Sequence, residues 1–193
     1  MTAVPKILAF AGSARKDSFN KKLVRIAAAG ARAAGSDVTL IDLADYRLPL
    51  FDQDEESEHG LPETGRKIKD LMLSHQGLLI SSPEYNSSIT PLLKNTIDWA
   101  SRPCPGEAPL ACFSGKVALL ISASPGALGG LRGLVHLRAI LGNIGTLVLP
   151  ATMSIPKAAD AFAEDGSLRD PGKQAAVEQL GGELVSFLHK LLA

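Results

Sequence analysis

The chain has 193 residues, of which 46% are apolar and 21% charged, and its 20 Lys and Arg balance its 20 Asp and Glu. This composition excludes a disordered chain. The zero net charge excludes an overall electrostatic field that would attract nucleic acid or membrane lipid. Two cysteines, Cys104 and Cys112, exclude a disulfide framework and lack the spacing of a zinc site, so reduced thiols in a cytoplasmic protein are predicted.

The first third of the chain predicts two strands and a helix. Residues 1–6 lack the pattern of a signal peptide, and the apolar run at 6–11 ends at a Gly-Ser pair, which is typical of a buried parallel strand. Apolar residues at helical spacing predict a helix over 18–34 that Gly35 closes. Residues 37–43 are rich in β-branched and apolar residues and predict a strand. The acidic stretch at 52–60 is predicted to be a loop.

The middle of the chain repeats this pattern. A helix is predicted over 63–75, then a buried strand at 77–81, then a helix over 90–100 with Pro91 in its first turn. Residues 102–113 contain three prolines and both cysteines and are predicted to be irregular. The long apolar run at 116–123 predicts the next strand.

A helix over 130–145, a short strand at 146–149 and an amphipathic helix over 174–192 complete the predicted order. No apolar run approaches the roughly 18 residues of a membrane-spanning helix. Strict alternation with short connections favours parallel strands covered by helices on both faces. We therefore predict an α/β fold with a doubly wound five-stranded parallel sheet, in a single domain over residues 1–193.

The loop at 12–20 has the composition of a phosphate site. Ligands of an open parallel sheet bind beyond the carboxyl ends of its strands, and this loop holds Ser13, Arg15, Ser18 and Asn20 just ahead of a helix, whose unpaired N–H groups favour an anion. It lacks the glycine patterns of triphosphate and dinucleotide loops, which favours a monophosphate. The alternative is that Ser18 caps the helix while Arg15 and Lys16 are solvated charges.

Two further loops are expected at the same edge. In residues 81–88, Pro83 restricts the backbone and Tyr85 is expected to pack on or beside a flat heterocycle. Glu84 is a candidate general base, or else a carboxylate that hydrogen-bonds the loop backbone or reaches across a subunit contact. The glycine-rich residues 122–130 allow a planar ligand to approach the backbone, or else form a plain turn into the next helix.

Together, the three loops resemble the NAD(P)H-dependent FMN reductase family, which includes chromate, quinone and azo-dye reductases. The resemblance covers nearly the whole chain. The matching residues are Gly12-Ser13-x-Arg15-x-x-Ser18-x-Asn20, then Pro83-Glu84-Tyr85-Asn86-x-Ser88 with Leu93-Lys94-Asn95-x-Ile97-Asp98-Trp99, then Ser124-Pro125-Gly126 with Gly129-Gly130-x-Arg132. The resemblance implies a flavodoxin-like fold, bound FMN, and NADPH or NADH as co-substrate.

The resemblance also implies a role for each matching residue. By this likeness the FMN phosphate is bound by Ser13, Arg15, Ser18 and Asn20, the isoalloxazine ring is bordered by Pro83, Glu84, Tyr85 and Asn86, and its other side is touched by Ser124 and Gly126. The family often has Pro-Gly where this chain has Thr90-Pro91. This difference shifts the entry to the helix over 90–100 and bears on acceptor specificity.

The implied reaction transfers a hydride from NAD(P)H through FMN to a small acceptor, such as a quinone, free flavin, an azo compound or chromate. The chemistry is then carried by FMN, so no catalytic side chain is expected. The four histidines are scattered along the chain, which argues against a catalytic triad and a metal site. Arg102 is a candidate for binding an anionic acceptor or the phosphate of NADPH; alternatively it is a solvated charge at a helix end.

Related proteins form dimers or dimers of dimers, so the resemblance implies a homodimer or a homotetramer. Two other functions remain open. A flavodoxin-like electron carrier also binds FMN, although such carriers are usually strongly acidic and this chain is not. A non-enzymatic flavin-binding regulatory protein is the third possibility, because a fold does not determine a function.

Overall fold

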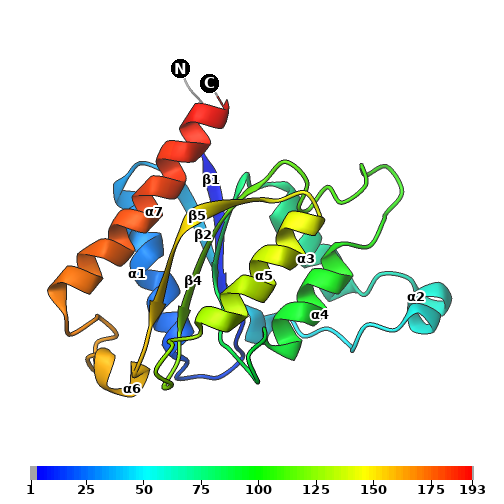
Figure 1. The fold of residues 1–193 in the computed structure, drawn as a ribbon. Coiled ribbons are helices and arrows are strands. Elements are labelled where there is room, and N and C mark those ends of the chain that lie inside the picture. The colour runs from blue at the N-terminus through cyan, green and yellow to red at the C-terminus, as the bar shows by residue number, and fades with distance from the viewer. Residues whose placement is uncertain (1–3, 193) are drawn as a thin grey trace.

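Five parallel strands form the centre of the computed structural model, which describes residues 4–192 (Figure 1). They stand in the order β2-β1-β3-β4-β5, and each neighbouring pair is parallel. The strands are β1 Lys6–Ala11, β2 Asp37–Asp42, β3 Gly77–Ser81, β4 Val117–Ala123 and β5 Leu147–Ile155. The chain order reverses between β1 and β3, as in a doubly wound sheet, so the predicted fold is confirmed.

Helices cover both faces of the sheet, as predicted (Figure 1). The main helices are α1 Phe19–Ala33, α3 Glu63–Leu73, α4 Pro91–Ala100, α5 Leu131–Asn143 and α7 Pro171–Leu192. Side chains of α1 and α7 pack against one set of alternate strand residues, including Ile7 and Leu79, while α3, α4 and α5 pack against the other set, including Leu8 and Leu78. In the described part of the chain, no helix combines the length and apolar character needed to cross a membrane.

The acidic stretch at 52–60 is not the loop that its composition predicts, because it contains the helix α2 (Gln53–His59). The carboxylate of Asp52 caps this helix by accepting the N–H of Asp54 at 2.8 Å. Acidic residues fill its first turn, where the helix dipole favours negative charge. None of its residues is buried, so α2 has no apolar periodicity from which to predict it.

The end of the chain also differs from its prediction. β5 extends to Ile155 past Pro150, which an edge strand tolerates because one side of its backbone needs no partner. α7 begins three residues early, at Pro171, because the carboxylate of Asp170 accepts the N–H groups of Gly172 and Lys173. Two short elements were not predicted, the 3-10 turn Leu43–Asp45 and the single-turn helix α6 Ala158–Ala161.

The carboxyl ends of β1, β3 and β4 lie side by side and remain joined just beyond the strands. Gly12 donates its N–H to the carbonyl of Ser81 at 2.9 Å, and Ser82 donates to the carbonyl of Ile121 at 2.9 Å. The three loops singled out by the sequence therefore leave the sheet from one edge, on either side of the reversal in strand order.

Candidate functional site

The loops that follow β1, β3 and β4 enclose one pocket at this edge. Its lining consists of Ser13, Arg15, Ser18, Phe19, Asn20, Pro83, Glu84, Tyr85, Ala123, Ser124 and Pro125. Eight of the ten expected cofactor-binding residues are thus brought together; Asn86 and Gly126 belong to the same loops but do not line the pocket. A larger hollow of about 240 Å³ lies between α1 and β2, but its Lys21 and Asp42 already form an ion pair. The loop pocket is smaller, with a volume of only about 60 Å³, but it differs from that hollow in the variety of its hydrogen-bond donors.

The β1 loop presents donors suited to an anion. Ser18 stands at the N-cap position of α1 but makes no side-chain cap hydrogen bond, which contradicts the alternative that its hydroxyl serves as the cap. Within residues 4–192, the backbone N–H groups of Phe19 and Asn20 donate to no other group. Arg15 is exposed, and its own N–H donates to the hydroxyl of Ser13 at 3.3 Å. The first turn of α1, two hydroxyls and one guanidinium therefore face the same space.

Asn20 is 3% exposed and uses its side-chain amide for the protein's own backbone. Its Nδ2 donates to the carbonyl of Ala123 at 2.8 Å, while its Oδ1 accepts the N–H of Ala123 at 2.9 Å and the hydroxyl of Ser81 at 2.8 Å. These bonds tie α1 to the ends of β3 and β4. The geometry therefore gives Asn20 a structural task that the resemblance did not indicate.

The β3 loop turns sharply beside the pocket. Pro83 is buried, Tyr85 is 49% exposed at the rim, and Asn86 has a positive φ of 51° in the turn that follows. The carboxylate of Glu84 accepts the backbone N–H of Gly133 in α5 at 2.8 Å. A hydrogen bond to backbone was the expected alternative to acid or base work by Glu84, although the partner belongs to α5 and not to the loop itself.

The β4 loop forms the opposite wall. The hydroxyl of Ser124 lines the pocket and accepts the N–H of Gly126 at 3.2 Å. Gly130 has a φ of 94°, and a Cβ atom there would lie 1.9 Å from the hydroxyl of Ser122, so the position requires glycine. The α6 segment supports this wall, because Ala158 donates its N–H to the carbonyl of Ser124 at 3.1 Å. One helical turn gives too weak a periodic signal to be predicted from sequence.

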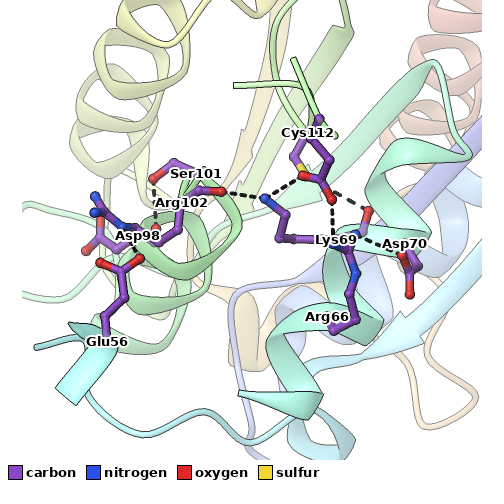
Figure 2. A network of polar contacts seen from close by, with 9 residues as sticks. Glu56, Arg66, Lys69, Asp70, Asp98, Ser101, Arg102 and Cys112 are labelled. Carbon is purple, nitrogen blue, oxygen red and sulfur yellow. Dashed lines mark hydrogen bonds and ion pairs between the residues drawn. The ribbon is translucent and has the colours of Figure 1, made fainter. Parts of the chain in front are cut away.

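Arg102 lies away from this pocket. Its Nε donates to the carboxylate of Glu56 at 2.7 Å (Figure 2). Its guanidinium lies 5.1 Å from the centre of the Phe51 ring. Its carbonyl accepts the ammonium of Lys69. The structure thus places Arg102 at the junction of α2, α3 and α4, and not among the residues that line the loop pocket.

Thr90 is a site-supporting residue that sequence reasoning did not assign. Its hydroxyl donates to the carbonyl of Gly12 at 2.7 Å and accepts the N–H of Leu93 at 3.1 Å. It therefore caps α4 and at the same time holds the start of the β1 loop. The Thr-Pro pair at 90–91 was the available signal, since threonine is a preferred N-cap and proline a preferred first helical residue.

Among residues 4–192, no cluster of three or more His, Cys, Asp or Glu side chains is arranged to hold a metal ion. The pocket offers hydroxyl, backbone N–H and guanidinium donors together with a half-exposed aromatic ring. Such a set suits an organic cofactor with an anionic group and a planar ring.

Comparison with known proteins agrees with this geometry. Residues 5–160 match the family model of NADPH-dependent FMN reductases. The chain is 40% identical over 145 residues to a 2-hydroxy-1,4-benzoquinone reductase of Burkholderia sp, which covers 75% of this chain and 74% of that protein. It is 34% identical over 184 residues to a quinone reductase of Escherichia coli strain K12, covering 94% and 93%.

Solved structures show the same fold. FerB, a flavoenzyme NAD(P)H:(acceptor) oxidoreductase from Paracoccus denitrificans, superimposes with a TM-score of 0.78 at 29% identity, over 97% of this chain and 98% of that one. A flavodoxin from the domain Archaea superimposes over 95% and 98% with a TM-score of 0.63, and its 12% identity makes it evidence for the fold alone. With the family match spanning most of the chain, the protein belongs to the NADPH-dependent FMN reductase family and is an NAD(P)H-dependent oxidoreductase with FMN as its cofactor.

Proposed function

We propose that this reductase passes two electrons from NAD(P)H through FMN to a quinone. The observation that carries the proposal is the pocket at the ends of β1, β3 and β4, whose lining combines anion donors with the half-exposed ring of Tyr85. When bound, FMN supplies the chemistry, since its ring accepts a hydride and returns it to an acceptor. The protein's side chains then bind and orient, and none of them needs to act as a nucleophile.

The residues of the pocket fit FMN. In this proposal the phosphate lies at the first turn of α1, where the N–H groups of Phe19 and Asn20, the hydroxyls of Ser13 and Ser18, and Arg15 all offer hydrogen bonds. The isoalloxazine ring lies between the β3 loop and the β4 loop. We propose that Pro83, Glu84, Tyr85 and Asn86 border one side of it, and that Ser124 and Gly126 border the other.

Exposed aromatic and apolar side chains in two of the loops that form the pocket favour a planar, partly apolar acceptor. Tyr85 is 49% exposed, and Leu128 of the β4 loop is 44% exposed. Two relatives are named as reductases of quinones. Free flavin, azo compounds and chromate are the other candidates, and the last two are compared directly with a quinone in the experiment below.

We further propose that the whole chain works as one domain in the cytoplasm and assembles as a homodimer or homotetramer. The exposed apolar side chains Leu131 and Val135 on α5 support an assembly, because they lie on the helix that follows the β4 loop. Analytical ultracentrifugation of the FMN-loaded protein tests this part separately, and a monomer at all concentrations would contradict it.

The function is tested by anaerobic stopped-flow titration of FMN-loaded protein with NADPH and, separately, with NADH. We expect the oxidised flavin band to bleach rapidly and to recover when a quinone is added. Recovery with chromate or an azo dye at an equal rate would show that the acceptor is not specifically a quinone. Flavin that binds without bleaching would instead favour an electron carrier or a regulatory protein.

A further inference from the structure

The carboxylate of Glu84 joins two walls of the pocket. Its Oε2 accepts the N–H of Gly133 at 2.8 Å, and Gly133 lies in the first turn of α5, where N–H groups have no partner within the helix. The β4 loop leads directly into α5. This hydrogen bond therefore connects the β3 loop on one side of the pocket with the element that continues from the other side.

Side chains of α5 hold the same loop at two more points. Arg132 Nη1 donates to the hydroxyl of Ser87 at 2.7 Å, and His136 Nδ1 lies 3.0 Å from the hydroxyl of Ser88. Between Glu84 and these contacts, Asn86 and Ser87 have φ values of 51° and 66°, a left-handed conformation that residues with a side chain seldom adopt. Such a conformation persists only where surrounding contacts determine it. Here they come from the paired backbone hydrogen bonds of Tyr85 and Ser88, at 2.9 and 3.0 Å, which close the turn, and from the side chains of α5.

The loop sits directly on the backbone of α5. A Cβ atom on Gly133 would lie 3.2 Å from the carbonyl oxygen of Ser88, which is tighter than ordinary van der Waals contact, and would touch the Cβ of Glu84 at 3.4 Å. Glycine at this position therefore lets the carboxylate reach the helix. Gly142, near the other end of the same helix, has no atom within 4 Å of a built Cβ and provides a matched comparison.

We propose that Glu84 is a positioning residue: by accepting the N–H of Gly133, it holds the β3 loop at the distance from the β4 loop that FMN requires, and it transfers no proton. The inference rests on the proposed function only in that FMN occupies this pocket. In this proposal the carboxylate acts as a hydrogen-bond acceptor, a role that a neutral amide oxygen can also fill. Gly133 has a spacing role, because it lets the β3 loop approach α5, and this role does not involve the flavin directly.

The first test compares Glu84→Gln with Glu84→Met, which have similar size but differ in whether they carry an oxygen acceptor. The dissociation constant of FMN is measured by flavin fluorescence, and the visible spectrum of the bound flavin is recorded. We expect Met to weaken FMN binding up to about tenfold more than Gln, the effect of one neutral hydrogen bond, and to shift the flavin spectrum. Glu58→Gln and Glu58→Met serve as controls, because Glu58 has a 76% exposed side chain.

The second test compares Gly133→Ala with Gly142→Ala. Alanine favours a helix in both places, so Gly142→Ala should unfold at the temperature of the parent protein or above it. For Gly133→Ala this gain offsets the small shift of the β3 loop, so its melting temperature should stay close to that of the parent. Only Gly133→Ala should weaken FMN binding, because its methyl group displaces the β3 loop. A melting temperature far below that of the parent, combined with weaker binding, would indicate general damage and would overturn the spacing role of Gly133.

The FMN affinities of the two Glu84 variants distinguish an acceptor role from a role of the charge or of a proton. Equal losses in Glu84→Gln and Glu84→Met would show that the negative charge or a proton is what matters, and would overturn the proposal. Parent-like FMN binding by Glu84→Met would overturn it as well. Because these readouts are FMN affinity and spectrum, they remain informative if NAD(P)H oxidation fails, in which case the proposed function is wrong while the role of Glu84 is still decided.

Discussion

At the scale of a residue, Asn20 joins the first turn of α1 to the ends of β3 and β4 through its side-chain amide. Its place in the motif at 12–20 suggests a phosphate ligand, and the structure does bring it to the pocket. Its amide, however, is engaged with Ala123 and Ser81, which are far away in the sequence. Motif spacing predicts which residues meet at the end of a strand, but not which of them face a ligand and which face the protein.

Replacing Asn20 with alanine is expected to destabilise the protein even without FMN. The change leaves the backbone N–H and carbonyl of Ala123 and the buried hydroxyl of Ser81 without their partners. We expect the free energy of unfolding to fall by about 2–4 kcal/mol in urea titrations of the FMN-free protein. Asn143→Ala, at an exposed position in α5, is the control. Unchanged stability with weaker FMN binding would show that Asn20 is a phosphate ligand alone.

For Arg15 we expect the opposite of Asn20, namely a loss of FMN affinity without a loss of stability. It lines the pocket and is exposed, as is its neighbour Lys16, which does not line the pocket. Arg15→Ala should weaken FMN binding by roughly 10- to 100-fold, the loss of a charge-assisted contact of about 1.5–3 kcal/mol, without changing the stability of the FMN-free protein. Lys16→Ala should bind FMN almost as the parent does. Equal effects of the two changes would indicate a diffuse charge effect and no specific contact by Arg15.

At the scale of elements, burial decides what the sequence reveals. β1, β3 and β4 are covered on both faces, so each is a continuous apolar run, and all three were predicted closely. α2 has no buried residue, and β5 is a partly exposed edge strand that contains Pro150. The existence of α2 depends on its cap, and the length of β5 depends on pairing along one side only. Neither feature leaves an apolar pattern in the sequence.

The crossing of α1 and α7 depends on two glycines that bring their backbones together. A Cβ on Gly181 would lie 2.0 Å from the carbonyl oxygen of Ala27, and a Cβ on Gly30 would lie 2.0 Å from that of Glu178. Backbone atoms cannot move aside as side chains do, so the helices themselves must separate. Close packing of this pair is thus a property of small residues that helical periodicity alone does not indicate.

Gly181→Ala is therefore expected to lower the free energy of unfolding by about 3 kcal/mol, at the upper end of the range for overpacked cores. The adjacent Gly182→Ala should raise it by up to about 1 kcal/mol, because a Cβ there meets only the Cβ of Ala34 at 3.7 Å and alanine favours a helix. Urea denaturation of both variants measures the difference. If Gly181→Ala were as stable as Gly182→Ala, the two helices would not pack as closely as the structure shows.

At the scale of the whole molecule, the net charge is zero, but a chain of paired charges links the helices α2 and α3 with the irregular loop at 102–113. Glu107 of the loop meets Arg66 and Lys69 of α3, Lys69 also donates to the carbonyl of Arg102, and Arg102 pairs with Glu56 of α2 (Figure 2). Lys69 is 2% exposed. Composition predicted neither the burial of this lysine nor its partners, because the loop returns to α3 only in three dimensions.

Glu107 makes this network sensitive to acid. Hydrogen bonds from Lys69 and Arg66 hold the pKa of its carboxyl below the ordinary value of about 4.3. A carboxylate whose pKa is lower in the folded state stabilises that state above its unfolded pKa, and this contribution is lost as the pH falls through the folded pKa. The stability that Glu107 provides is thus present at neutral pH and disappears below about pH 4.

Glu107→Gln tests this dependence. The variant keeps a side chain of the same size, but it leaves the buried ammonium of Lys69 without a counter-charge, so the free energy of unfolding at pH 7 should fall by about 2 kcal/mol. The gap from the parent protein should narrow steadily between pH 5 and pH 3 in urea titrations, because acid removes the same charge from the parent. Glu63→Gln, in a solvent-exposed pair with Lys67, should change little at any pH. A gap that stays constant down to pH 3 would mean that Glu107 stabilises the loop by packing and not by charge.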